Sequence, residues 1–130
     1  MASTSCAEPR VRVAPSAIAG HGVFAAERLP RETRLGAYEG ERLNEAQYWA
    51  RYPQDNPIYV LRLRRGYVDA ADPARSNFAR FINSPKGTRK RANVYFRAPD
   101  GAVVTKRAIR AGEELLVDYG PTYSWGEPQT

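Results

Sequence analysis

The sequence predicts a mainly β, α+β fold in which several small sheets accompany one short helix. Short runs rich in β-branched and aromatic residues recur along the chain, and turn residues separate them. Only one segment carries both a helix start signal and a helix stop signal. Strands and helices therefore do not alternate, which argues against a doubly wound parallel sheet.

The predicted strands are short, and glycine, proline or polar turn residues bound them. The turns fall at residues 20–22, 65–66, 99–101 and 111–112, and each of them contains glycine. We expect strands at residues 11–13, 23–25, 35–38, 58–63, 67–69, 93–97, 102–105 and 115–117. Strands of this length favour several small sheets over a single large one.

The one predicted helix begins after Asn44, which can cap its first turn. Gln47 stands three residues later and can complete a capping box, and Pro53 ends the helix. One face of this helix is predicted to be apolar and carries Ala46, Trp49 and Ala50. A second, shorter helical turn is predicted for residues 77–81.

The 130 residues fit one domain, because a chain of this size hides roughly two-thirds of its unfolded surface in a single core. Residues 1–10 are small and polar, so we expect a flexible N-terminus. No run approaches the roughly 20 apolar residues that cross a bilayer, and the N-terminus lacks the apolar centre of a signal peptide. We therefore expect a soluble, intracellular protein.

Composition excludes several kinds of chemistry. Cys6 is the only cysteine and His21 the only histidine, so the chain can form neither an internal disulfide nor a zinc site from the usual ligands. Neither the dinucleotide nor the nucleoside-triphosphate glycine motif is present, and the usual covalent triads cannot be built. Catalysis would have to use tyrosines, carboxylates, backbone groups or a bound cofactor.

A net charge of +6 favours acidic partners such as nucleic acid.

Four segments form a pattern when they are taken in order. They are AGHGVFA (residues 19–25), YEGE (38–41), NFARFIN (77–83) and EELLVDYG (113–120). Each alone is a weak signal, since a glycine turn that enters a strand is common in hairpins, but their order and spacing together are specific. Together they resemble the SET-domain family. The resemblance covers residues 11–121 as a SET domain, and residues 122–130 would form a short tail that lacks the zinc cysteines of related tails.

The resemblance implies a fold and an activity. Small sheets would surround a C-terminal pseudoknot of the β-clip type, with the segment that ends in Tyr119 passing beneath the loop after Phe81. S-adenosylmethionine would bind on one face, and a substrate lysine would enter a narrow channel from the other. The implied reaction is methyl transfer to a lysine side chain, with a histone as the expected substrate. The nucleus or chromatin would be the expected location if the source is eukaryotic or viral.

The resemblance also assigns residues to the cofactor. Gly20 and Gly22 would let the backbone approach the methionine part of the cofactor. His21 between them is expected to be an exposed turn residue, and Phe81 could serve equally in core packing. The full predicted cofactor set is Gly20, His21, Gly22, Arg80, Phe81, Asn83, Ser84 and Tyr119.

Tyr119 and Tyr59 match the tyrosines that act on the substrate lysine in the family. Tyrosines suit this reaction because alignment alone can supply about 7 to 11 kcal/mol in favourable cases. A lysine must also lose a proton, which costs roughly 4 to 5 kcal/mol at pH 7, and desolvation in an aromatic channel lowers that cost. The predicted channel residues are Tyr38, Tyr59, Val117, Tyr123 and Trp125. For Tyr38 and Trp125, a core role and a channel role both remain open.

The sequence departs from the family at the segment that follows Asn83. The usual Asn-His motif appears as Asn83-Ser84-Pro85, so the histidine is missing. Relatives of the PR type also lack it, and some of them methylate while others act mainly as interaction modules. The alternative prediction is therefore a PR-like module with weak or no activity. Val117 leaves more room than the aromatic residue of many relatives, so the number of methyl groups transferred stays open.

A basic loop follows the altered motif and contains Lys86, Arg89, Lys90 and Arg91. It is interpreted either as a solvated loop or as a contact with nucleosomal DNA or an acidic protein. A homodimer is a further expectation, since small stand-alone viral members of the family pair in this way. A third hypothesis is a basic nucleic-acid-binding β-protein without a cofactor.

Overall fold

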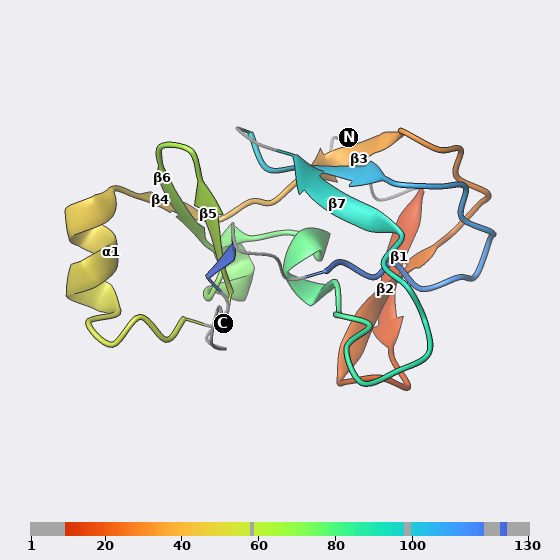
Figure 1. Ribbon diagram of the computed structural model, residues 1–130, viewed down its shortest axis with the longest axis horizontal. Helices are drawn as coiled ribbons and strands as arrows, with labels where there is room; N and C mark the ends of the chain where they lie inside the picture. The colour runs from red at the N-terminus through yellow and green to blue at the C-terminus, as the bar shows by residue number, and fades with distance from the viewer. Residues whose placement is uncertain (1–9, 58, 98–99, 119–122, 125–130) are drawn as a thin grey trace.

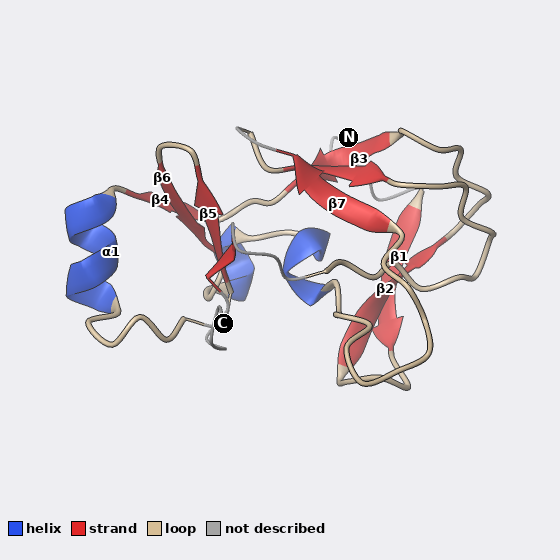
Figure 2. Ribbon diagram, in the orientation of Figure 1, coloured by secondary structure: helices blue, strands red, loops and turns tan. Residues whose placement is uncertain are grey.

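The computed structural model describes residues 10–57, 59–97, 100–118 and 123–124. Within these residues the chain forms short strands, one α-helix and two 3-10 turns (Figures 1 and 2). In chain order they are β1 Val11–Pro15, β2 His21–Ala25, β3 Arg34–Ala37, β4 Glu41–Leu43, α1 Glu45–Arg51, β5 Val60–Leu63, β6 Gly66–Asp69, η1 Pro73–Arg75, η2 Phe78–Phe81, β7 Val94–Arg97, β8 Ala102–Thr105 and β9 Tyr123–Ser124. The predicted mainly β fold class is confirmed.

The strands form three antiparallel sheets with the orders β1-β2, β3-β8-β7 and β4-β6-β5-β9. Figure 2 shows α1 and the four-stranded sheet at one end of the molecule, and the other two sheets at the opposite end. The η2 turn lies between these two ends (Figure 1). The segment NFARFIN, which contains η2, therefore lies where the sheets meet.

One hydrophobic cluster connects the sheets. Its buried members come from all three sheets and from Leu115, and they include Val23 on β2, Leu61 on β5 and Val103 on β8. A smaller cluster of Leu43, Tyr48, Val60 and Tyr67 lies beneath α1. Burying each large aliphatic side chain contributes about 1.5 to 3 kcal/mol, so these clusters supply much of the stability of a chain without disulfides.

The helix α1 starts as predicted but packs through a different face. Asn44 accepts from the Gln47 amide at 2.8 Å, and the Gln47 side chain accepts from the Asn44 amide at 2.8 Å, which confirms the capping box. The predicted apolar face is wrong, because Trp49 is 38% exposed and Ala46 and Ala50 are exposed. Tyr48 is instead fully buried, with its ring stacked on Tyr67 at 4.0 Å. In a helix this short, burying and stacking an aromatic ring stabilises the packing more than burying two alanine methyl groups would.

The predicted strand at residues 115–117 forms isolated bridges. Leu116 pairs in parallel with Asn83, and Val117 pairs in parallel with Val94. Val117 N donates to Asn83 O at 3.0 Å, and Asn93 N donates to Leu116 O at 2.9 Å. Residues 114–117, the threaded segment, therefore pass between the two ends of the loop that joins Asn83 to Asn93. This is the passage that the predicted pseudoknot requires.

Asn93 fixes the threaded segment from the other side through its buried side chain. Its Nδ2 donates to Glu114 O at 2.9 Å, and its Oδ1 accepts from Leu116 N at 2.7 Å. One amide side chain thus replaces the ladder partner that an isolated segment lacks, which satisfies backbone groups buried in the core. In the part of the chain that the structure describes, no helix is long and apolar enough to cross a membrane.

Candidate active site

The glycine turn, the end of η2 and the threaded segment meet around the side chain of Asn83. Its Nδ2 donates to Ala19 O at 3.2 Å, to His21 O at 3.1 Å and to a carboxylate oxygen of Glu114 at 3.0 Å. Three acceptors around one atom identify that atom as the amide nitrogen. The Asn83 side chain therefore joins the glycine turn to the threaded segment.

Glu114 is the charged member of this cluster, although only 6% of its surface is exposed. Both carboxylate oxygens accept from the Ser16 hydroxyl, at 2.9 and 3.1 Å, and one also accepts from Asn83. No lysine or arginine of the described chain forms an ion pair with Glu114. A buried carboxylate held only by neutral donors favours a cation beside it.

The two glycines of the turn have different neighbours. A Cβ added to Gly22 would lie 2.2 Å from a Glu114 carboxylate oxygen, so the carboxylate occupies the space that a side chain would need. Gly20 has a φ of +40°, and a Cβ added there would meet no described atom within 4 Å. The requirement for glycine at position 22 therefore comes from Glu114, whereas the open side of the turn lies at Gly20.

Arg80 ties the end of η2 to the end of β6. Its Nε donates to Ala70 O at 2.7 Å and its Nη2 donates to Ala71 O at 3.3 Å. The guanidinium also lies over the Tyr59 ring, 4.1 Å from its centroid, and 4.9 Å from the centroid of Phe81. Stacking of this kind contributes about 0.5 to 2 kcal/mol. Arg80 therefore positions Tyr59, a predicted channel residue, against the turn that leads to Asn83.

The remaining predicted cofactor residues lie around this turn. His21 is exposed and its ring stands edge-on to Phe81 at 6.1 Å. Phe81 is partly buried and packs against the main core cluster. Ser84 lies one residue beyond Asn83, where its hydroxyl accepts from Lys86 N at 3.0 Å and so shapes the start of the basic loop.

The predicted channel residues are only partly brought together. Tyr38 is 4% exposed and packs edge-on against Phe96, and Val117 is 1% exposed within the same core cluster. Tyr59 is half-buried and directly precedes β5. Strand β9 lies beside β5, where Tyr123 pairs with Leu61 and Ser124 pairs with Val60. The predicted residues Tyr119 and Trp125 lie outside the described residues.

A second buried carboxylate, that of Asp69, supports the backbone that binds Arg80. Asp69 is 3% exposed and accepts from Arg51 at 3.1 Å, from the Tyr52 hydroxyl at 2.7 Å and from Ala71 N at 2.9 Å. Burial, followed by the bond to Asp69, raises the pKa of Tyr52 to about 12. Because Arg80 binds the Ala70 and Ala71 carbonyls, this network fixes the backbone that holds Arg80 in place.

Sequence reasoning missed Ser16, Glu114 and Asn93 as members of the site. Glu114 did carry a signal, because a glutamate directly before Leu115-Leu116-Val117 places a charge at the edge of a buried run. Ser16 carried none, since its partner lies 98 residues away in the sequence.

A threaded C-terminal segment, a glycine turn and an asparagine that joins the two are features of SET domains. The family model for the SET domain matches residues 20–120, and the chain belongs to this family. The predicted family is thereby confirmed. Histone-lysine N-methyltransferase set-17 of Caenorhabditis elegans is 32% identical over 109 residues, a match that covers 81% of this chain and 38% of that protein. The chain thus spans less than half the length of this relative.

Two solved structures share the fold. The methyltransferase domain of human PR domain-containing protein 2 has a TM-score of 0.62 and 25% identity, and the match covers 93% of this chain and 82% of that one. A humanized mutant of the Chaetomium thermophilum Polycomb Repressive Complex 2 has a TM-score of 0.70 and 24% identity, over 87% of this chain and 15% of that one. The second likeness establishes the fold alone.

Proposed function

We propose that this chain is an S-adenosylmethionine-dependent protein-lysine N-methyltransferase whose substrate is a histone. The observation that carries the proposal is the cluster of Asn83, Glu114 and the glycine turn, built on the threaded segment that leads to Tyr119. The family membership supports it, and so does the name of the Caenorhabditis elegans relative. The nucleus or chromatin is the location proposed with it.

The acceptors at the glycine turn fit the cofactor on chemical grounds. When bound, S-adenosylmethionine supplies an electrophilic methyl group on a sulfonium, and its methionine part carries an ammonium. The Ala19 and His21 carbonyls and the Glu114 carboxylate gather acceptors and negative charge around Asn83 at the glycine turn. We assign the ammonium to these groups, since charge-assisted hydrogen bonds are the stronger kind.

On the substrate side, the proposal assigns the lysine amine to Tyr59 and Tyr119. Tyr59 is held in place by Arg80, so its ring can form a fixed wall of a channel. A fixed aromatic wall removes water from the amine and lowers its pKa, and it also attracts the cationic product. The site then needs no strong base, and the Tyr119 hydroxyl serves to orient the amine for in-line attack.

The competing proposal is a PR-like module with weak or no activity that acts in protein or nucleic-acid binding. The observation that favours it is Ser84 at the position of the family histidine, with its hydroxyl engaged by Lys86 N. A homodimer also stays a prediction, as does the contact between DNA and the loop that contains Lys86, Arg89, Lys90 and Arg91.

Isotope-labelled S-adenosylmethionine, incubated with the protein and a panel of core histones, decides between these functions. We expect one labelled lysine, located by mass spectrometry, and a loss of about 100-fold in rate for Tyr119→Phe, because one positioned hydroxyl is worth about this factor. Tyr95→Phe is the control, since the Tyr95 hydroxyl bonds Glu32 on the surface.

Each result has a distinct meaning. Saturable binding of the cofactor without any labelled product would assign the chain to the PR-like modules. Absence of cofactor binding would overturn the methyltransferase, and robust turnover would overturn the PR-like module.

A further inference from the structure

The structure joins the basic loop to a distant segment and forms a pocket between them. The pocket has a volume of about 460 Å³ and is lined by Lys90 and Arg91 from the loop, by Lys106 and Arg107 after β8, and by Asp118 with two apolar residues. The sequence alone indicates only the loop as a basic cluster. Folding of the chain brings Lys106 and Arg107 next to that loop.

The loop side of this cationic pocket is held in shape by its own hydrogen bonds. Thr88 donates to Pro85 O through its amide at 2.9 Å and through its hydroxyl at 2.7 Å, and the same hydroxyl accepts from Lys90 N at 3.0 Å. Gly87 supplies the positive φ of +84° that this turn requires. The cationic side chains therefore extend from an ordered backbone.

The two sides of the pocket are also joined to each other. Arg107 donates to Arg91 O at 3.5 Å, and Lys106 N donates to Asn93 O at 2.8 Å. Asn93 in turn binds the threaded segment through Leu116 and Glu114. A ligand in the cationic pocket would thus lie on the loop that encloses the candidate active site.

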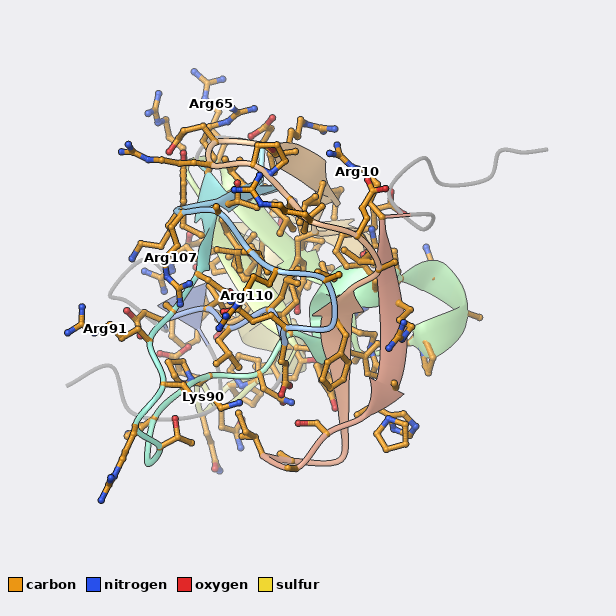
Figure 3. The ribbon with its side chains drawn as sticks, turned by 90° about the vertical axis from the view of Figure 1, so that its right-hand side faces the viewer. Arg10, Arg65, Lys90, Arg91, Arg107 and Arg110 are labelled. Atoms are coloured by element: carbon orange, nitrogen blue, oxygen red, sulfur yellow. The ribbon has the colours of Figure 1, made fainter. Side chains whose placement is uncertain are left out.

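The charges in the pocket are largely unpaired. Arg107 pairs with Glu113 at 3.4 Å, but Lys90, Arg91 and Lys106 are exposed and pair with no carboxylate among the described residues. Three unpaired cations and the single carboxylate of Asp118 leave a net charge of +2 in the hollow. Figure 3 shows Lys90, Arg91 and Arg107 in the same part of the molecule, well away from Arg65.

We propose that the cationic pocket binds the phosphate backbone of duplex DNA. Arginine and lysine side chains from two directions match the oxygens of a phosphate, and the net charge of +6 attracts a long polyanion. An acidic protein is the weaker fit, because Pro85 and Ala92 are the only apolar lining and protein interfaces carry an apolar core. The choice of substrate rests on the proposed function. If the pocket holds DNA and the chain methylates lysine, the expected substrate is a lysine of a DNA-bound protein.

The test removes three charges from the pocket in the variant Lys90→Gln/Arg91→Gln/Lys106→Gln. The matched control is Arg42→Gln/Arg64→Gln/Arg65→Gln, which removes one exposed charge from β4 and two from the turn between β5 and β6. Fluorescence anisotropy with a labelled duplex of mixed sequence gives the affinity over a series of salt concentrations, without cofactor or histone. Thermal unfolding of all three proteins checks that the folds are equally stable.

We expect the pocket variant to bind the duplex at least about tenfold more weakly at low salt, and its salt slope to fall by about 2 to 3. The control should change both quantities much less. Equal slopes for the wild-type protein and the pocket variant would overturn the proposal. So would displacement of the duplex by S-adenosylmethionine, or tighter binding of a polyglutamate peptide of equal charge.

A second measurement separates this inference from the proposed function. The pocket variant should methylate a free histone peptide at the wild-type rate and nucleosomes at about a tenth of it or less. Equal rates on nucleosomes would overturn the role of the pocket in substrate choice. If the wild-type protein methylates neither substrate, the proposed function fails, while the anisotropy comparison still decides whether the pocket binds DNA.

Discussion

At the scale of single residues, Gly22 and Glu114 depend on each other. The sequence places Gly22 in a turn that should face the cofactor, but the structure places a carboxylate oxygen in the space of its missing side chain. Glu114 is in turn bonded to Ser16 and Asn83. One glycine therefore permits a buried charge, and that charge orients the asparagine beside the proposed cofactor site.

Gly22→Ala should lower the free energy of unfolding by about 1 to 3 kcal/mol, because the added methyl group displaces the Glu114 carboxylate. Cofactor affinity should fall with it, as measured by isothermal titration calorimetry. Urea unfolding of Gly22→Ala, Glu114→Ala and the double variant completes a double-mutant cycle. The double variant should lose less free energy of unfolding than the sum of the losses of the two single variants.

Gly20→Ala is the matched control, since its cost comes only from backbone strain at positive φ, about 1 kcal/mol. If the two losses of the cycle simply add, Gly22 and Glu114 do not interact, and the conclusion about the glycine is wrong.

At the scale of elements, local chemistry was readable from the sequence and long-range pairing was not. The capping box of α1 lies within four residues, so Asn44 and Gln47 predicted it. Strand β4 was missed, because Glu41-Arg42-Leu43 has no apolar run and becomes a strand by pairing with β6. The face on which α1 packs was predicted wrongly for a similar reason. That face is set by the stacking of Tyr48 on Tyr67, which lies in β6.

The network that anchors α1 predicts a pH dependence. The pKa of Tyr52 is raised to about 12 in the folded protein, above the ordinary value of 10.0. The folded state therefore holds this proton more tightly, so the contribution to stability is complete below about pH 10 and is lost as pH rises towards 12. Urea unfolding across this range should show a smaller loss for Tyr52→Phe than for the wild-type protein.

Tyr59→Phe serves as the comparison for this experiment, because it removes a tyrosine hydroxyl outside the Asp69 network. An equal pH dependence in the wild-type protein and Tyr52→Phe would show that Tyr52 does not carry the effect.

At the scale of the whole molecule, the threaded segment decides how the parts hold together. Leu115 N donates to Val23 O at 2.7 Å, while Asn83 and Asn93 bind the same segment from either side. The family motifs predicted this passage, and the spacing of residues alone could not have done so. The partners of the segment lie tens of residues away, and only their arrangement in space makes them neighbours.

Asn93→Ala should lower the free energy of unfolding by about 2 to 4 kcal/mol. The substitution leaves the buried Leu116 amide and Glu114 carbonyl without their partner, and each such group costs about 1 to 3 kcal/mol. Urea unfolding measures the loss. Asn56→Ala, at an exposed position, should leave stability nearly unchanged, and a similar loss in both variants would contradict the role given to Asn93.

The position of the threaded segment in the sequence has a consequence for biosynthesis. A ribosome that has made the chain as far as Thr105 has already produced the glycine turn, η2 and the three-stranded sheet, but not residues 114–117. The nascent chain at that stage lacks Glu114 and the centre of the fold, and contacts between distant residues form slowly. We expect the protein to acquire its candidate active site only after residues 114–117 have been made, and a chaperone that shields the open core until then should increase its yield.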